Sequence, residues 1–332
     1  PETRKWIDWK GAQRLLRSPV LNASLMKMGL ATAPHPVYVR GDEITDRACD
    51  WIASQRGRFF LWAHYMDAHW PYHIPGSLET GRSRAQAWRD LGVMWKSRKS
   101  HPGNAVLQRV KRLYDAGIAY IDQQIGHLLR CLDTQGFGPT TAVIVTADHG
   151  EAFYEHGRWQ HGAYFDFYDE VLRIPLIINL PGQEKSQRIA QQVCTLDLAP
   201  TILHLLKIPI DPRMEGSSLL PVARGEGELN TRPVITEMMD LKGWSCTAIR
   251  TPEFKYIYDE RRPGHRDMYD LVADPGETRN VYGKHPDVEA RLEDLLRDHL
   301  ERTRGADSGH DAEESEQSDE VVRRLRALGY LE

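Results

Sequence analysis

Two groups of histidines and acids each follow an apolar run of the sequence, and these residue types could bind a cation or exchange protons. The first run is RFFLWAHYM at residues 58–66, and the second is TTAVIVTAD at residues 140–148. The polar side chains are His64, Asp67, His69 and His73 at the first run, and Asp148, His149, Glu151, Glu155, His156 and His161 at the second. Sites in α/β sheets form beyond the carboxyl ends of the strands, so both groups are candidates for a functional site.

The Asp148–His149–Gly150 step is the most specific of these features. An Asp and a His in adjacent positions just after a strand can both reach one cation if the backbone turns sharply, and Gly150 permits such a turn. The same residues also fit an ordinary capped turn without a metal. The spacing alone leaves both interpretations open.

Other candidate residues have simpler structural interpretations. A His in an aromatic loop such as DAHWPYH, residues 67–73, is typical of a packed or exposed residue. We expect Glu155–His156–Gly157 to form a turn that the glycine makes possible. The four cysteines lie far apart without a CxxC pair, which predicts neither a disulfide scaffold nor a zinc cluster; they are Cys49, Cys131, Cys194 and Cys246.

Apolar periodicity predicts that helices and strands alternate over most of the chain. Helices are expected at residues 41–57, 105–135, 168–173 and 196–206, the last with Asp197 as its N-cap. Buried strands are expected at residues 58–66, 140–148 and 174–182. This order predicts an α/β fold with a mostly parallel sheet sandwiched by helices.

The pattern changes after about residue 230. Strands are expected at residues 232–239, 245–259 and 267–275, followed by a helix at residues 286–303. These elements predict a small C-terminal antiparallel α+β lobe. The predicted organisation is therefore an α/β catalytic domain at residues 1–229, the α+β subdomain at 230–303, and an acidic linker with an amphipathic tail at 304–332.

Composition excludes several classes of protein. The 332 residues include 43 Lys and Arg against 47 Asp and Glu, and 41% of residues are hydrophobic, which is the balance of a globular chain. The net charge of −4 provides no basic surface for nucleic acid. No apolar run approaches the roughly 18 residues that span a bilayer, so no membrane span is expected. The sequence does not indicate an oligomeric state.

Four segments together resemble the sulfatases of the alkaline-phosphatase-like superfamily. They are FFLWAHYMDAHWPY at residues 59–72, the long segment from TAVIVTADHGEAFYEHG to IINLPG at 141–182, TLDLAPTILHLL at 195–206, and MYDLVADPGETRN at 268–280. Their order and spacing are those of the family, and the resemblance covers nearly everything from about residue 40 onward. It implies an enzyme, a sulfuric ester hydrolase, whose substrate is a sulfate ester of a small molecule or glycan.

The resemblance also implies roles for individual residues. Asp148 and His149 match two ligands of a divalent cation, usually Ca²⁺, with Mn²⁺ or Mg²⁺ as alternatives. Calcium prefers oxygen ligands, whereas the imidazole of His149 suits Mn²⁺ or Zn²⁺ better. His69 matches a residue that contacts the sulfate and helps protonate the leaving oxygen. His161 matches a position that carries Lys or His and faces the same sulfate.

The family's nucleophile has no counterpart in this sequence. Sulfatases carry two Asp ligands and then a Cys- or Ser-x-Pro-x-Arg motif that is converted to formylglycine, and both are expected upstream of Pro1. The segment most similar to this motif runs from Cys246 to Arg250, but it has Ala248 where the motif has Pro. We interpret Cys246 as a strand residue. The chain is thus expected to be the C-terminal two-thirds of a sulfatase, inactive alone.

Two alternatives remain at this stage. The same fold and the Asp–His pair suit a phosphodiester or phosphonate monoester hydrolase, or a phosphoglycerol transferase. A non-catalytic binding module or remnant is the third possibility, since the sequence lacks a nucleophile.

Overall fold

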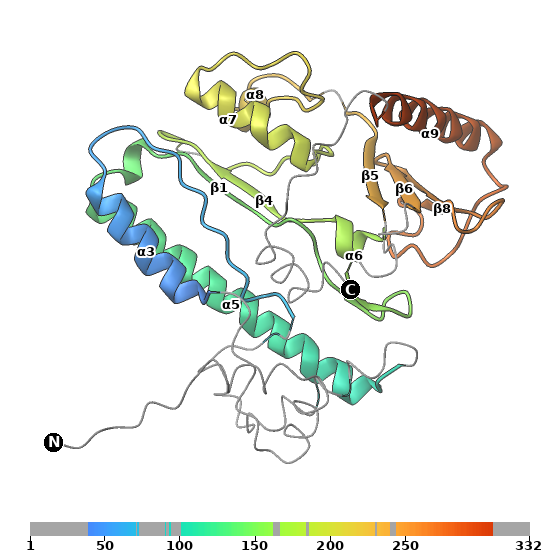
Figure 1. The fold of residues 1–332 in the computed structure, drawn as a ribbon, viewed down its shortest axis with the longest axis horizontal. Coiled ribbons are helices and arrows are strands. Elements are labelled where there is room, and N and C mark those ends of the chain that lie inside the picture. The colour runs from blue at the N-terminus through green and yellow to red at the C-terminus, as the bar shows by residue number, and fades with distance from the viewer. Residues whose placement is uncertain are drawn as a thin grey trace. The chain divides into compact units, whose positions relative to one another are not determined.

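The structure is a computed structural model that describes residues 39–70, 72, 90, 93, 101–161, 167–183, 186–229, 231–239 and 244–307. It divides into two compact units: unit 1 comprises residues 1–138 and 318–332, and unit 2 comprises residues 139–317 (Figure 1). The predicted acidic linker and amphipathic tail lie outside the described residues from residue 308 onward.

Unit 1 is built on two amphipathic helices, α3 (Gly41–Ser54) and α5 (Asn104–Thr134), close to the predicted ranges. Their apolar residues recur at helical spacing, and Ile52 of α3 and Val110 of α5 are fully buried, as is the polar Thr45 of α3. The two helices pack against each other (Figure 1). Apolar burial along this seam therefore forms the core of the described part of unit 1.

The prediction of a strand at residues 58–66 is wrong, because the structure contains no paired strand there. These residues have no regular secondary structure, and the exposure of their side chains alternates, with Phe60 62% and Trp62 78% exposed. No strand pairs with them within the described part of the chain. The apolar pattern favours an extended backbone, but a strand also needs a neighbouring backbone to complete its hydrogen bonds. The side-chain pattern does not specify that neighbour.

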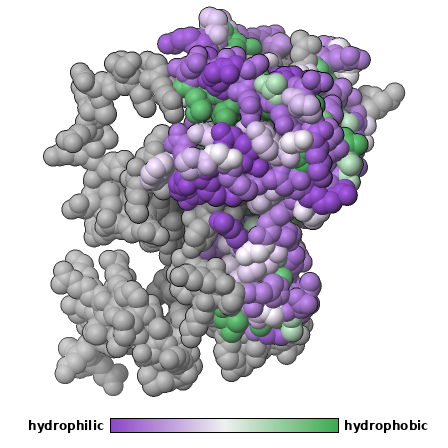
Figure 2. Space-filling model, turned by 90° about the vertical axis from the view of Figure 1, so that its right-hand side faces the viewer, coloured by the Kyte–Doolittle hydropathy of each residue, from purple (hydrophilic) through white to green (hydrophobic). Residues whose placement is uncertain are grey.

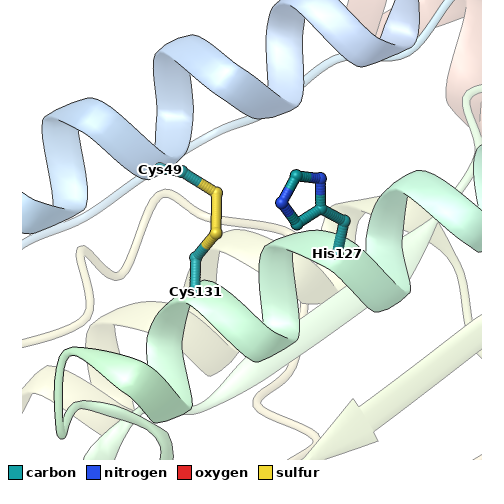
Figure 3. Close-up of side chains that lie close together, drawn as sticks. All are labelled: Cys49, His127 and Cys131. Atoms are coloured by element: carbon teal, nitrogen blue, oxygen red, sulfur yellow. A yellow bond between two sulfur atoms is a disulfide. The ribbon is translucent and has the colours of Figure 1, made fainter.

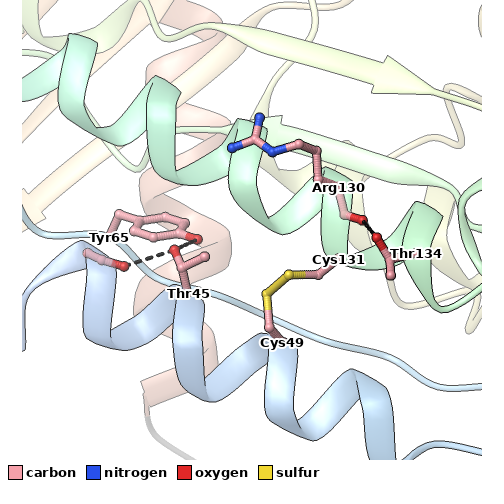
Figure 4. Close-up of a disulfide and its surroundings, with 7 residues drawn as sticks. Thr45, Cys49, Tyr65, Arg130, Cys131 and Thr134 are labelled. Atoms are coloured by element: carbon pink, nitrogen blue, oxygen red, sulfur yellow. Dashed lines mark hydrogen bonds between the residues drawn. A yellow bond between two sulfur atoms is a disulfide. The ribbon is translucent and has the colours of Figure 1, made fainter.

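A disulfide joins α3 to α5, contrary to the expectation from the cysteine spacing. Cys49 and Cys131 are 82 residues apart in sequence, and their Cα atoms are 5.7 Å apart (Figure 4). Packing of the two helices brings them together, and linear spacing carries no signal of that packing. Nearby, the Thr45 hydroxyl donates to the Gly41 carbonyl at 2.9 Å and lies 3.0 Å from the Tyr65 hydroxyl.

The short 3-10 helix η2 (Gly138–Thr140) spans the boundary between the units in the sequence. Unit 2 contains strands β1 (Val143–Thr146) and β4 (Leu176–Asn179) at the predicted positions. The two strands pair antiparallel, so the expectation of a mostly parallel sheet is not met by the described strands. Thr146 lies opposite Leu176, because the chain leaves β1 and enters β4 at the same end. The segment between them contains the single-turn helix α6 (Asp169–Leu172).

The predicted C-terminal antiparallel lobe is confirmed. Strands β5 (Val234–Met239), β6 (Ser245–Arg250), β7 (Phe254–Asp259) and β8 (Arg266–Asp270) form one antiparallel sheet in sequence order. Helix α9 (Pro286–Asp307) packs on it (Figure 1). The shared core comprises Ile249, Tyr256, Met268, Leu292 and Leu296.

The remaining helices of unit 2 are η3 (Thr195–Asp197), α7 (Leu198–Leu206) and α8 (Leu220–Ala223). Asp197 occupies the predicted N-cap position of α7, but its carboxylate does not cap the helix. It accepts hydrogen bonds from the Ser217 amide at 2.7 Å, the Cys194 amide at 2.9 Å and the Arg232 guanidinium at 2.8 Å. Burial by itself would raise the pKa of Asp197. The hydrogen bonds from Ser217, Cys194 and Arg232 have the larger effect, so the pKa lies below its ordinary value.

The described surface is hydrophilic (Figure 2), as the composition predicts. On the face shown in Figure 2, the described residues are mostly hydrophilic, and hydrophobic residues form small separate patches. Among the described helices, none combines the length and apolarity needed to cross a bilayer.

Removing the disulfide should destabilise unit 1. The bond closes a loop of 82 residues, so replacing Cys49 and Cys131 by Ser should lower the free energy of unfolding by about 2–4 kcal/mol. Urea unfolding of the oxidised wild type and of the double variant measures this difference. As a control, a reductant should destabilise the wild type and leave the double variant unchanged. Equal unfolding curves for the oxidised wild type and the variant would contradict the prediction.

Candidate active site

The Asp148–His149–Gly150 step lies where β1 ends and β4 begins. The Thr146 hydroxyl donates to the Pro175 carbonyl at 2.9 Å, which ties the two strand ends together. The Gly150 amide donates to the Val171 carbonyl of α6 at 2.7 Å. A Cβ atom at Gly150 would lie 2.1 Å from the Glu170 carbonyl oxygen. Glycine is therefore required here by the close approach of α6.

The local hydrogen bonds orient the side chains of Asp148 and His149 so that both could act as metal ligands. Nδ1–H of His149 donates to the Gly150 carbonyl at 2.7 Å, which places the proton on Nδ1 and the ring's lone pair on Nε2. That Nε2 atom is 3.7 Å from Oδ2 of Asp148. The other carboxylate oxygen, Oδ1, accepts from the His149 amide at 2.9 Å. The Asp148 side chain is 59% exposed, so a cation in solvent could reach its carboxylate.

This donor pair fits part of a divalent cation site. A carboxylate oxygen and an imidazole nitrogen at this separation can bind one ion, and the bond from Nδ1 to a backbone carbonyl is typical of metal-binding histidines. Two donors do not complete the coordination of any such ion. Further ligands would have to come from elsewhere.

His161 lies beside this pair. The ring centroids of His149 and His161 are 3.8 Å apart and their planes are inclined by 32°. Nδ1 of His161 lies 3.0 Å from Oε1 of Glu151, whose side chain is 3% exposed. The structure thus brings together three of the predicted residues, Asp148, His149 and His161, and adds Glu151 as the partner of His161.

A short hairpin explains why Glu151 faces His161. Strands β2 (Ala152–Phe153) and β3 (Trp159–Gln160) pair with Ala152 opposite Gln160, so the next position places residue 151 opposite residue 161. The connecting turn has Gly157 at φ 76°, which confirms the predicted turn. Sequence reasoning grouped Glu151 with the other acids but gave it no partner, because the hairpin register was not recognised.

His156, within this turn, links the hairpin to α6. Its Nδ1 is 2.7 Å from Glu170, its Nε2 is 3.1 Å from the Glu277 carbonyl, and its ring stacks on Tyr168 with centroids 3.6 Å apart. Burial disfavours the charged imidazole, but the hydrogen bond and charge of Glu170 outweigh burial and raise the pKa of His156. The residue fixes the hairpin that carries Glu151 and His161.

Helix α6 is in turn held by four charged residues, Asp169, Arg250, Lys255 and Glu277, which we call the buried ion network. Lys255, whose side chain is 0% exposed, contacts Asp169 and Glu277 at 2.6 Å each. Arg250 donates to both Asp169 oxygens, at 3.0 and 2.8 Å, and Glu277 accepts from the Asp169 amide at 2.7 Å. Burial raises the pKa of Asp169, but Arg250 and Lys255 more than reverse this and lower it to about 2.

His69 belongs to unit 1, and its position is fixed within that unit. It lies in a turn in which its amide donates to the Met66 carbonyl at 2.9 Å and its own carbonyl accepts from the Tyr72 amide at 3.0 Å. Its Nδ1 donates to the Trp70 carbonyl at 2.7 Å. Any role beside the residues of unit 2 therefore remains an inference from the sequence.

Among the described residues, neither His64 nor Cys246 has contacts typical of a catalytic group. His64 lies 3.0 Å from the Met66 sulfur, and His73 lies outside the described residues. Cys246 is buried in β6, where burial raises the pKa of its thiol to about 12. Arg250, at the other end of the segment that resembles the motif, binds Asp169. The interpretation of Cys246 as a strand residue is confirmed.

Comparisons with known proteins point to one family. Residues 4–208 match the sulfatase family, and residues 155–305 match the family described as N-sulphoglucosamine sulphohydrolase, C-terminal. Arylsulfatase K of Gallus gallus is 30% identical over 200 residues, 58% of this chain and 37% of that protein. The N-acetylglucosamine-6-O-sulfatase of Bacteroides thetaiotaomicron is 30% identical over 220 residues, 63% of this chain and 38% of that protein.

A solved structure extends the likeness to the fold. The phosphonate monoester hydrolase of Agrobacterium radiobacter superposes with a TM-score of 0.64 at 20% identity, covering 92% of this chain and 70% of that one. At this identity the likeness shows the α/β fold class and does not distinguish between reactions. The chain spans well under half the length of the two sulfatases above.

The close approach at Gly150 can be tested by adding a methyl group. Gly150→Ala should lower the free energy of unfolding of unit 2 by about 1–3 kcal/mol, because the new Cβ overlaps the Glu170 carbonyl. The matched control is Gly276→Ala, whose Cβ would have no neighbour nearer than 3.7 Å and should change stability by less than about 0.5 kcal/mol. Urea unfolding of both variants measures these changes. An equal loss of stability in Gly150→Ala and Gly276→Ala would contradict the close approach of α6 to Gly150.

The buried ion network predicts a defined dependence on pH. Because the pKa of Asp169 falls from 3.8 unfolded to about 2 folded, its ionisation stabilises the fold above about pH 4 and this stability is lost as the pH falls towards 2. The stability difference between wild type and Asp169→Asn should shrink across that range. The exposed variant Glu226→Gln serves as control and should follow the wild type. A difference that is constant from pH 5 to pH 2 would contradict the prediction.

Proposed function

Since the chain belongs to the sulfatase family, we propose that it contributes part of the active site of an enzyme that hydrolyses sulfate esters. The observation that carries the proposal is the pairing of the Asp148 carboxylate with Nε2 of His149, 3.7 Å apart, beside the ring of His161. Members of the family bind a divalent metal and carry a formylglycine. The residues of this chain fit the metal-binding half of that arrangement.

Asp148 and His149 would hold the divalent cation. When bound, the cation supplies positive charge that stabilises the negative charge developing on the sulfate. Calcium is the proposed ion, and Mn²⁺ or Mg²⁺ are the alternatives; of the three, Mn²⁺ is the best suited to a nitrogen ligand. The Gly150 carbonyl fixes the tautomer of His149, so its lone pair stays on the side of Asp148.

His161 would bind the sulfate as a cation. The Glu151 carboxylate accepts from Nδ1–H of His161 at 3.0 Å and so orients the ring, and a cationic donor at this position would stabilise an anion with a dispersed charge. His69 is proposed to protonate the leaving oxygen. The Trp70 carbonyl holds the proton of His69 on Nδ1, which directs proton exchange to Nε2.

The nucleophile is proposed to be a formylglycine that this sequence does not contain. When present, its hydrate would supply the oxygen nucleophile for attack on sulfur. The 332 residues alone are accordingly proposed to have no turnover. The substrate is proposed to be a small-molecule or glycan sulfate ester, as the names of the two sulfatase relatives suggest.

Substitution of the donor pair tests this function in the full-length enzyme. Asp148→Ala should lower kcat for an aryl or sugar sulfate about a hundredfold or more, because the charge that stabilises the transition state is lost. Asp211→Ala, at a partly exposed aspartate of the same unit that lies outside the candidate site, is the matched control and should retain turnover. Unchanged turnover in Asp148→Ala would refute the assignment. Turnover of a phosphonate ester in place of the sulfate would move the enzyme to another reaction.

A further inference from the structure

A second group of metal-binding side chains lies in unit 1, on the helices that the disulfide joins. His127 lies one turn before Cys131 on α5 and on the same face of the helix, while Cys49 faces them from α3 (Figure 3). One ligand atom of each of the three residues lies within 4.8 Å of the other two. None of the three is buried, so an ion could enter from solvent.

We propose that Cys49, Cys131 and His127 form a redox-gated Zn²⁺ site, closed as the disulfide and able to bind the metal when the two cysteines are reduced. Two thiolates and one imidazole are a zinc donor set that leaves a fourth position for water. A disulfide sulfur carries no thiolate charge and does not ligate the ion in this way. The two states of one cysteine pair are therefore mutually exclusive.

The helix pair has contacts that persist after reduction. The Asp42 amide of α3 donates to the Tyr120 hydroxyl of α5 at 3.1 Å. The Gly41 amide donates to Asp67 at 3.2 Å, and the backbone of Asp67 also packs against Gly117 of α5. These contacts do not involve sulfur. They keep Cys49 within reach of Cys131 once the covalent bond is broken.

His127 is free to serve as the third ligand. Across the part of the chain that the structure describes, no hydrogen bond holds its ring. Either ring nitrogen can thus turn towards the two sulfur atoms with only a side-chain rotation. By contrast, the rings of His149 and His156 are held by hydrogen bonds to carbonyl or carboxylate oxygens.

A dithiol reductant supplies the electrons and protons needed to convert the disulfide state into the metal-binding state. The dithiol gives two electrons and two protons to the Cys49–Cys131 bond, which becomes two thiols while the dithiol becomes a disulfide. Binding of Zn²⁺ then displaces one proton from each thiol. The net effect is that a covalent cross-link is replaced by a metal cross-link between the same helices.

Cobalt(II) is the probe for this site, because a thiolate bound to Co²⁺ gives a charge-transfer absorption that oxygen and nitrogen ligands do not give. The full chain is treated with EDTA, reduced with a phosphine, which adds no thiol, and titrated with Co²⁺ and then with Zn²⁺. The reduced protein should bind one Co²⁺ with this absorption, and Zn²⁺ should abolish it. The oxidised protein should show none. A cation at Asp148 and His149 does not contribute to this signal.

Variants assign the ligands. Cys49→Ser should abolish the absorption, and His127→Ala should weaken Co²⁺ binding at least about tenfold, since even residues that only hold a ligand in place are worth about 10–100-fold. Cys194→Ser and His265→Ala are the matched controls for a thiol and an imidazole elsewhere in the chain, and both should bind as the wild type does. His127→Ala retains both cysteines, and its unfolding curve when oxidised shows whether it is folded.

Three results would overturn the proposal. They are the absence of the absorption in the reduced protein, its survival in Cys49→Ser, and unchanged affinity in a folded His127→Ala. None of these results bears on sulfate ester hydrolysis, because the site uses residues that the active-site proposal does not.

Discussion

The charge on Lys255 is the constraint on which the arrangement of unit 2 depends. Its side chain is fully buried, and a buried ammonium is tolerated only where opposite charges and hydrogen bonds replace water. Asp169 from α6 and Glu277 from the turn after β8 supply that replacement, each at 2.6 Å. Removing one partner of such a group typically costs about 3–5 kcal/mol, because the remaining charge stays buried. The position of α6 is thus determined by the need to neutralise a lysine of the C-terminal sheet.

The candidate metal donors are positioned through that helix. Gly150 contacts the backbone of α6 through a hydrogen bond of 2.7 Å, and Asp148 and His149 directly precede it. Glu170, also on α6, holds His156 and with it the hairpin that carries Glu151 and His161. No residue of the C-terminal sheet is a candidate ligand, yet β6 and β7 provide Arg250 and Lys255, which fix α6. The C-terminal lobe therefore supports the site. Without it, neither the pair Asp148 and His149 nor the pair Glu151 and His161 would be held in position.

Sequence reasoning succeeded where one side-chain pattern determines one local structure. Helical spacing gave α3 and α5 to within a few residues, and the polar residues after an apolar run identified Asp148, His149 and His161 as a group. It failed where the outcome depends on a partner distant in sequence. Residues 58–66 have no described strand beside them, β1 and β4 pair antiparallel, and Cys49 meets Cys131 across 82 residues. The carboxylate of Asp197 was likewise assigned to a cap because Ser217 and Arg232 are not adjacent in sequence.

The two units position their candidate residues by the same device, a close backbone approach that only glycine allows. At Gly150 a Cβ would lie 2.1 Å from the Glu170 carbonyl oxygen, and at Gly117 of α5 it would lie 2.9 Å from the Asp67 carbonyl oxygen. Asp67 precedes His69 by two residues, so packing of α3 and α5 fixes the turn that carries His69. The cross-link between Cys49 and Cys131 acts on this helix pair and not on α6. A change at the cysteines would consequently be transmitted to the turn of His69 first, whereas Asp148 and His149 depend on the buried ion network.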